Sequence, residues 1–277
     1  MKILDFRVRP PFKSFMDCEV YDTQAMIAWA KRFGVPLGKS ALEKSLDIFW
    51  QETERAQIEK VVIAGNLRKP VGVKNQDVNE FAELYKDKVL AAPCINPLNP
   101  VSAIEEINTY IINGACKAIM MEPGYLDEPL LADDKRIYPV YEFCQEKNIP
   151  VLLSIGGFCG PNVRFNNPMQ IENIAAQFTN LKIAVCHACW PYTAEICHVA
   201  MNREFVYLAP DMYVFNCPGA DDYIRAANYL IPEKMVYGSA YPIFSLEESI
   251  AFYKNCGIQE KHFENLFYNN AATFFDL

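Results

Sequence analysis

The sequence predicts an α/β fold, a (β/α)8 TIM barrel formed as a single domain by residues 1–277, and three observations favour it. Short β-branched or apolar runs alternate with longer helical stretches along the whole chain. With right-handed crossovers, such alternation builds a parallel sheet that can close on itself. A length of 277 residues suits one barrel. The first predicted turn, Arg9-Pro10-Pro11-Phe12, has no glycine, whereas the competing doubly wound nucleotide-binding fold needs a glycine-rich turn there.

Eight short segments are rich in β-branched or other apolar residues and are predicted as strands. In chain order they are Ile3–Arg9, Lys60–Ala64, Val89–Cys94, Lys117–Met121, Val151–Ser154, Ile183–His187, Phe205–Leu208 and Met235–Tyr237. Amphipathic segments between them are predicted as helices: Val101–Asn113, Tyr138–Lys147, Pro168–Phe178, Ala194–Met201, Asp221–Leu230 and Leu246–Tyr253. Asn-Pro pairs at 99–100 and 167–168 mark element boundaries.

The stretch between the first two strands, residues 10–59, breaks the regular alternation. It begins with the Pro10-Pro11 breaker and carries helical patterns over Thr23–Phe33 and Ala41–Gln57. Connections that follow the strands of a barrel frame its active site. We therefore expect an insertion that serves as a lid.

The composition excludes several classes of partner. Lys and Arg total 26 against 34 Asp and Glu, a net charge of −8, which argues against nucleic acid or an anionic membrane surface. No apolar run approaches the roughly 18 residues of a membrane span. Charges interrupt the N-terminal stretch where a signal peptide is apolar, so we expect a cytoplasmic protein. The ten cysteines are scattered along a long chain, which favours free thiols over a disulfide framework.

Catalytic groups of a parallel barrel lie at the carboxyl ends of its strands. The residues predicted at those ends are Arg7, Arg9, Asn66, Asn96, Glu122, Ser154, His187, Asp211 and Ala240. Aromatic residues near the same end could line an apolar pocket. They are Trp190, Tyr192, Tyr213, Phe215 and Tyr241.

These segments together resemble the amidohydrolase superfamily, in particular its branch of decarboxylases, hydratases and lactonases. The resemblance spans nearly the whole chain, and the order and spacing of the segments carry it. They are Ile3-Leu4-Asp5-Phe6-Arg7-Val8-Arg9-Pro10, Asn148-Ile149-Pro150-Val151-Leu152-Leu153, Asn180-Leu181-Lys182-Ile183-Ala184-Val185-Cys186-His187, Val236-Tyr237-Gly238-Ser239-Ala240-Tyr241-Pro242 and Tyr268-Asn269-Asn270-Ala271-Ala272-Thr273-Phe274-Phe275. The last of these segments resembles the terminal helix of that superfamily.

The resemblance implies a divalent metal held by a His-x-His on the first strand, single histidines on the fifth and sixth, and an aspartate on the eighth. Here Arg7 and Arg9 stand at the His-x-His, Ser154 at the fifth-strand position and Ala240 at the eighth; His187 alone matches. Arginine stays protonated and has no lone pair for a cation. We therefore expect no metal at the family's usual site and no cofactor. A zinc site at Cys186-His187-Ala188-Cys189 is disfavoured, because no second ligand pair follows.

Two arginines on one strand face suit an anion such as a carboxylate or phosphate. Burying both is costly unless negative charges accompany them. One alternative is an acidic ligand; the other is an internal salt-bridge network with Asp5, Glu122 or Asp211. His187 can exchange protons near neutral pH, and Asp211 is a second titrating group or an arginine partner.

Three functions follow from these residues. The first is a metal-independent hydrolase or lyase acting on a small organic acid, with His187 and Asp211 catalytic and with Arg7, Arg9, Glu122, Ser154 and Tyr241 binding substrate. The second is an inactive relative that binds an acidic metabolite or serves as a structural subunit. The third is an enzyme that recruits a metal through His187, Glu122 and Asp211. The sequence leaves substrate identity and homo-oligomer formation open.

Overall fold

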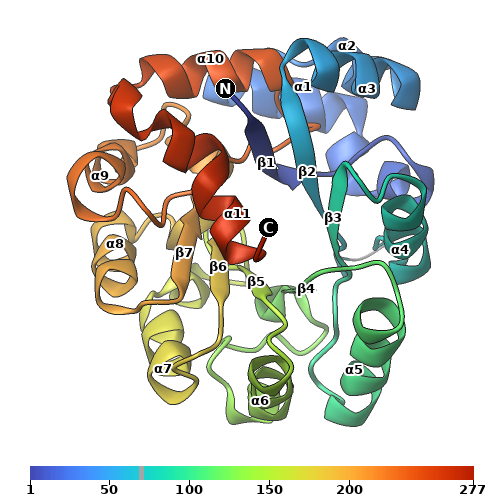
Figure 1. Cartoon of the computed structure of the whole chain (residues 1–277), viewed down its shortest axis with the longest axis vertical. Helices are drawn as coiled ribbons and strands as arrows, with labels where there is room; N and C mark the ends of the chain where they lie inside the picture. Colours follow the sequence, from blue (N-terminus) through green and yellow to red (C-terminus); the bar gives the residue numbers. More distant parts are fainter. Residues whose placement is uncertain (69–71) are drawn as a thin grey trace.

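The structure is a computed structural model that describes residues 1–68 and 72–277. Figure 1 shows a ring of strands surrounded by helices, the arrangement of a TIM barrel. The predicted fold class is therefore confirmed. The strands are β1 (Ile3–Val8), β2 (Ile58–Ala64), β3 (Val89–Ala92), β4 (Ile119–Met121), β5 (Val151–Ser154), β6 (Ile183–Cys186) and β7 (Val206–Ala209).

The strands form two parallel sheets, β1-β2-β3 and β4-β5-β6-β7. A parallel bridge from Cys94 to Met120 links β3 to β4. On the other side, residues 234–241 lie between β7 and β1: the Val236 amide donates to the Leu208 carbonyl at 2.9 Å, and the Phe6 amide donates to the Tyr237 carbonyl at 2.9 Å. These links join the two sheets into the ring.

The predicted eighth strand, Met235–Tyr237, is wrong as a regular strand. Among the described residues, this segment forms one isolated bridge, from Met235 to Leu208. The Tyr237 amide donates to the Leu266 carbonyl outside the sheet, which interrupts the ladder after two residues. The segment occupies the position of the eighth strand without its full hydrogen-bond pattern.

The helices of the structure follow the strands in chain order. They are α1 (Thr23–Phe33), α2 (Lys39–Glu43), α3 (Leu46–Arg55), α4 (Asn75–Leu84), α5 (Pro100–Ile107), α6 (Tyr138–Glu146), α7 (Met169–Gln177), α8 (Thr193–Asn202), α9 (Ala220–Arg225), α10 (Leu246–Asn255) and α11 (Asn270–Phe274). Each predicted helix overlaps one of them, and α11 lies within the closing segment that resembles the terminal helix of the superfamily. Helix α4 was not among the predicted helices. No helix in the described ranges has the length and apolar content needed to cross a membrane.

Alternate strand residues form an apolar cluster inside the ring. It includes Leu4, Phe6, Val62, Ala64, Leu90, Ala92, Met120, Leu152, Ala184, Cys186, Tyr207, Ala209 and Val236. Helix α11 lies across one end of the ring in Figure 1, where Phe274 packs on Phe6 with ring centroids 5.5 Å apart. That end is therefore covered by the C-terminal helix, which leaves the opposite end, at the strand carboxyl ends, for a site.

A register shift in β1 sets the direction of the first-strand arginines. Asp5 pairs with Val61 but Val8 pairs with Ile63, so β1 has one residue more than β2 between these pairs. Such a bulge re-aims the side chains beyond it. Phe6 lies inside the ring, Val8 packs in a different apolar cluster, and Arg7 and Arg9 are buried at the carboxyl end of the strand.

Residues 10–57 form the predicted insertion, with α1, α2 and α3. Asp22 caps α1 by accepting the Ala25 amide, and Ser45 caps α3 by accepting the Ile48 amide. The insertion contacts the barrel mouth through Tyr21, whose hydroxyl donates to the Arg9 carbonyl at 2.7 Å. Its action as a lid remains a prediction.

Candidate functional site

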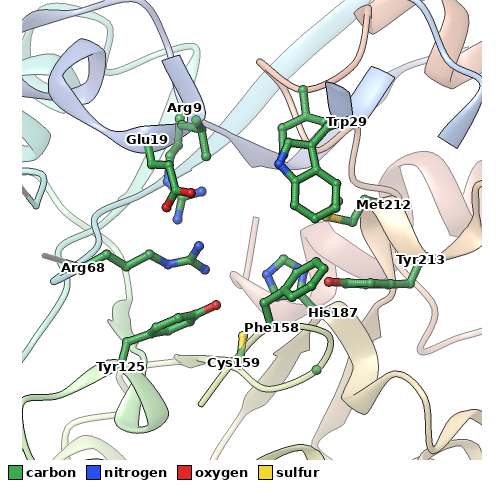
Figure 2. A pocket seen from close by; sticks show the side chains of 13 residues that line it. Arg9, Glu19, Trp29, Arg68, Tyr125, Phe158, Cys159, His187, Met212 and Tyr213 are labelled. Atoms are coloured by element: carbon green, nitrogen blue, oxygen red, sulfur yellow. The ribbon is translucent and has the colours of Figure 1, made fainter. Parts of the chain in front are cut away.

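A cavity of about 340 Å³ opens at the carboxyl ends of the strands. Its polar lining comes from Arg9, Glu19, Arg68, Tyr125, Cys159 and His187. Figure 2 shows Arg9 and Arg68 directed toward each other at one side of the cavity, with His187 at the other side behind Phe158. A much smaller cavity of about 20 Å³ adjoins it and is lined by Arg7, Arg9 and His187. The cavity thus brings together residues that follow β1, β2, β4, β5 and β6.

His187 and Asp211 form a buried pair, as side chains from the ends of β6 and β7. The Nδ1 atom of His187 lies 2.9 Å from Oδ1 of Asp211, and the His187 amide donates to Oδ2 at 3.2 Å. Both residues have left-handed backbones, with φ of +67° and +42°. That strained conformation turns both side chains off the sheet and toward each other. A carboxylate only accepts hydrogen bonds, so Nδ1 carries a proton and Nε2 is left as an acceptor. The His187 residue lines both cavities.

Arg7 completes a group with this pair. Its Nη2 lies 3.4 Å from His187 Nε2, and its Nε lies 3.8 Å from Asp211 Oδ2. Burial lowers the pKa of His187 below its ordinary value, Asp211 opposes this shift, and the positive charge of Arg7 adds to it. Neutral His187 can accept a hydrogen bond from Arg7 at Nε2, which is consistent with this geometry.

Arg9, Arg68 and Glu122 form a second group. Glu122 Oε1 lies 3.8 Å from Arg9 Nη2 and 3.5 Å from Arg68 Nη2, and the Glu122 side chain is fully buried. Burial alone would raise the pKa of Glu122, but Arg68, Arg9 and Arg7 outweigh it and lower this pKa. Burial, together with the positive charge of Arg7, lowers the pKa of Arg9 to about 10. Two guanidiniums here share one carboxylate.

Several buried guanidinium nitrogens have no hydrogen-bond partner within the described residues. They are Nη1 of Arg7, Nε and Nη2 of Arg9, and Nε of Arg68. Buried N–H donors are nearly always satisfied in folded proteins, and leaving one unsatisfied costs about 1–3 kcal/mol. These N–H groups are therefore available to donate hydrogen bonds to a ligand or to water.

The other predicted site residues lie at different depths. Ser154 is buried, and its Oγ lies 3.4 Å from Cys159 Sγ behind the cavity lining. Tyr241 and Ala240 line the small cavity, and the Tyr241 hydroxyl lies 2.8 Å from Ser40 Oγ. Asn66 is buried beside Cys18, with its Nδ2 3.5 Å from the sulfur. Asn96 is exposed and accepts the Leu98 amide, so it does not line either cavity.

The predicted aromatic cluster is divided between sites. Tyr213 lines the cavity and stacks on Trp190 with ring centroids 5.0 Å apart. Phe215 packs in the core against Phe244, and Tyr192 lines a separate surface groove. The cavity instead acquires Trp29 from α1 and Phe158 from the loop after β5, whose rings lie 4.9 Å apart.

Sequence reasoning missed Arg68 and Tyr125. The Arg68 guanidinium lies 4.0 Å from the Tyr125 ring centroid, in cation–π contact. Arg68 follows β2 by four residues, two beyond Asn66, which was predicted at the same strand end. Its position as the third strand-end arginine was the signal available in the sequence.

The donor set does not fit the metal that the superfamily resemblance implies. Arg7, Arg9 and Ala240 offer no lone pair at their positions. Glu122 is held between Arg9 and Arg68 rather than beside His187 and Asp211. Within residues 1–68 and 72–277, no three His, Cys, Asp or Glu side chains gather as a metal-binding group. The ten cysteines are free thiols, including Cys186 and Cys189.

Comparison with known proteins gives a family and several structural neighbours. The amidohydrolase family model matches residues 52–277, which excludes β1 and both Arg7 and Arg9. An uncharacterised TIM-barrel protein from Bordetella bronchiseptica has 33% identity and a TM-score of 0.95, over 100% of this chain and 99% of that chain. No curated protein matches the chain.

Two more distant structures share the fold. A 2,6-dihydroxybenzoate decarboxylase from Rhizobium has 13% identity and a TM-score of 0.72, over 100% of this chain and 99% of its own. A manganese-bound 5-carboxyvanillate decarboxylase from Novosphingobium aromaticivorans has 12% identity and a TM-score of 0.67, over 99% and 97% of the two chains. At these identities the likeness concerns the barrel alone.

Proposed function

Because this chain belongs to the amidohydrolase family, we propose that it is a metal-independent hydrolase or lyase acting on a small carboxylated compound at the barrel mouth. The observation that carries the proposal is the set of buried guanidinium N–H groups without acceptors beside the His187–Asp211 pair. A carboxylate supplies acceptors in the planar geometry that guanidiniums favour. Two of the fold neighbours are named as decarboxylases of aromatic acids, which is compatible with such a substrate.

In this proposal, Arg7 and Arg9 hold the substrate and stabilise negative charge that develops during the reaction. His187 Nε2 accepts a proton from water or from the substrate and later returns it. Asp211 stabilises the positive charge that His187 acquires and keeps its proton on Nδ1. Arg7 has to turn its Nη2 from His187 toward the substrate before Nε2 is free to act.

The same contact supports the second candidate, a catalytically inactive relative that binds an acidic metabolite. In the structure, Arg7 Nη2 lies 3.4 Å from Nε2, the atom that a general base needs free. An inactive protein would keep this contact when an acid is bound. Turnover therefore separates the two candidates, because both predict acid binding.

A thermal-shift screen of small carboxylic acids tests the proposal. We expect some acids to stabilise the protein, and we expect this stabilisation to disappear in Arg7→Ala and Arg9→Ala but to persist in the exposed control Arg164→Ala. Acids that stabilise all variants equally would contradict the proposed binding role. Turnover of a stabilising acid that survives His187→Ala would remove His187 from the mechanism.

Elemental analysis tests metal independence separately. We expect active protein, purified without chelator, to contain no stoichiometric zinc or manganese. Stoichiometric metal that is required for turnover would overturn this part of the proposal.

A further inference from the structure

The two charged groups at the barrel mouth differ in their balance. Around His187, one guanidinium (Arg7) faces one carboxylate (Asp211), and burial and Arg7 favour the neutral imidazole. Around Glu122, two guanidiniums, Arg9 and Arg68, face a single carboxylate oxygen. Counted over these six side chains, the first group sums to zero charge, whereas the second carries one excess positive charge. Asp5, the other buried carboxyl beside Arg7, has its pKa raised by burial to about 7.

The excess charge is next to open space. Arg9 and Arg68 both line the large cavity, whereas Arg7 reaches only the small one of about 20 Å³, which has room for little more than a water molecule. Arg9 is 7% exposed; its Nε and Nη2 lack hydrogen-bond partners, and Nη2 lies 3.8 Å from Glu122. Glu19 lines the same cavity but is exposed at its rim, where water screens its charge.

Arg68 is held in place from two sides. Its Nη2 lies 3.5 Å from Glu122, and its guanidinium lies over the Tyr125 ring at 4.0 Å. A stacked guanidinium keeps its edge free for in-plane hydrogen bonds. Figure 2 shows the Arg68 guanidinium extending into the cavity next to the guanidinium of Arg9. The two arginines therefore approach the same space from different strands, β1 and β2.

We propose that Arg68, with Arg9, binds the acidic group of the substrate, and that Arg7 acts at the reacting end beside His187. This inference rests on the proposed function and assigns the carboxylate to the Arg9–Arg68 side of the large cavity. One excess positive charge suits one carboxylate. The remainder of the substrate then extends toward His187, where the neutral group accommodates an uncharged portion such as an ester, lactone or enone.

Formate binding tests the assignment, because formate is the smallest carboxylate and formamide is its uncharged analogue. Each is titrated at constant ionic strength against the wild-type protein and against Arg68→Met, which keeps part of the apolar contact with Tyr125 but removes the charge. Arg7→Met, Arg9→Met and the exposed control Arg164→Met complete the set. The shift of the unfolding temperature with concentration reports affinity.

We expect formate, but not formamide, to bind the wild type, with at least a tenfold loss of affinity in Arg68→Met and Arg9→Met and no change in Arg164→Met. Unchanged formate affinity in Arg68→Met, together with loss in Arg9→Met and Arg7→Met, would overturn this inference and leave the proposed function standing. Unchanged affinity in all three variants, or no formate binding, would overturn both. Arg68→Lys provides a second variant if Arg68→Met does not fold, and we expect weakened binding because lysine loses the planar fork.

Discussion

The two charged groups at the barrel mouth are built from arginines and a carboxylate, but they differ in net charge. Arg7, His187 and Asp211 contact one another within 4 Å and form a closed set with balanced charge. Arg9 and Arg68 converge on Glu122 and leave a positive charge beside the large cavity. From the sequence, a ligand site and an internal salt-bridge network are competing explanations for the arginine pair. We infer that the salt-bridge network holds Arg7 until a substrate binds, whereas Arg9 belongs to the ligand site.

The largest expected effect comes from breaking the balanced group. Asp211→Asn leaves Arg7 buried without a counter-charge, and opening a buried ion pair costs about 3–5 kcal/mol. Asparagine keeps the side-chain shape and tolerates the positive φ at this position. Urea unfolding measures the loss, with the exposed Asp221→Asn as the control. A loss below about 1 kcal/mol would show that Asp211 does not balance Arg7.

An intermediate effect is expected in the unbalanced group. Glu122→Gln should cost about 1–3 kcal/mol, because the partly exposed Arg68 can turn toward water once its partner is neutral. Excess formate should restore more stability to this variant than it adds to the wild type, since it can replace the missing carboxylate. The exposed Glu142→Gln serves as the control. If formate stabilised Glu122→Gln and the wild type equally, the proposed excess of positive charge around Glu122 would be contradicted.

The smallest effect is a pH dependence of stability. The pKa of His187 is lowered by burial and by Arg7, so the unfolded chain binds this proton more readily than the folded one. The contribution of neutral His187 to the free energy of unfolding is therefore fully present above the ordinary histidine pKa of about 6.5, and it decreases as the pH falls below that value.

One proton corresponds to a slope of at most about 1.4 kcal/mol per pH unit. His187→Gln should remove this contribution, and the exposed His198→Gln controls for the loss of an imidazole elsewhere. Unfolding experiments between pH 5 and pH 8 measure it, roughly the range in which histidine titrates. An unchanged slope in His187→Gln would mean that Arg7 and burial do not hold this residue neutral.

Much of the fold could be predicted because it depends on local pattern. The strands from β2 to β7 and six of the surrounding helices coincide with apolar runs and amphipathic segments. The prediction of a regular eighth strand was wrong because its hydrogen bonds depend on residues distant in sequence. One example is the Leu266 carbonyl, which accepts the Tyr237 amide. Asn96 follows a strand as expected, but its side chain bonds the next turn and stays exposed.

Part of the candidate site could be predicted, because the order of the strands fixes which residues meet at the barrel mouth. Arg7, Arg9, His187 and Asp211 follow strands whose ends meet in any closed barrel, so their proximity follows from topology. Arg68 was missed because its role depends on Glu122 and Tyr125, which follow β4 and are more than 50 residues away in the chain. The charge imbalance appears only when these three loops are placed together.

The central claim is that permanent positive charges at the barrel mouth bind an acid where related barrels hold a metal ion. A crystal structure of the protein with an acid that stabilises it in the thermal-shift screen tests this most directly. We expect the carboxylate against the Arg9 guanidinium, with His187 Nδ1 still bonded to Asp211. A cation coordinated beside Arg7 and Arg9, or an acid bound elsewhere while Arg9 projects into bulk water, would contradict the account.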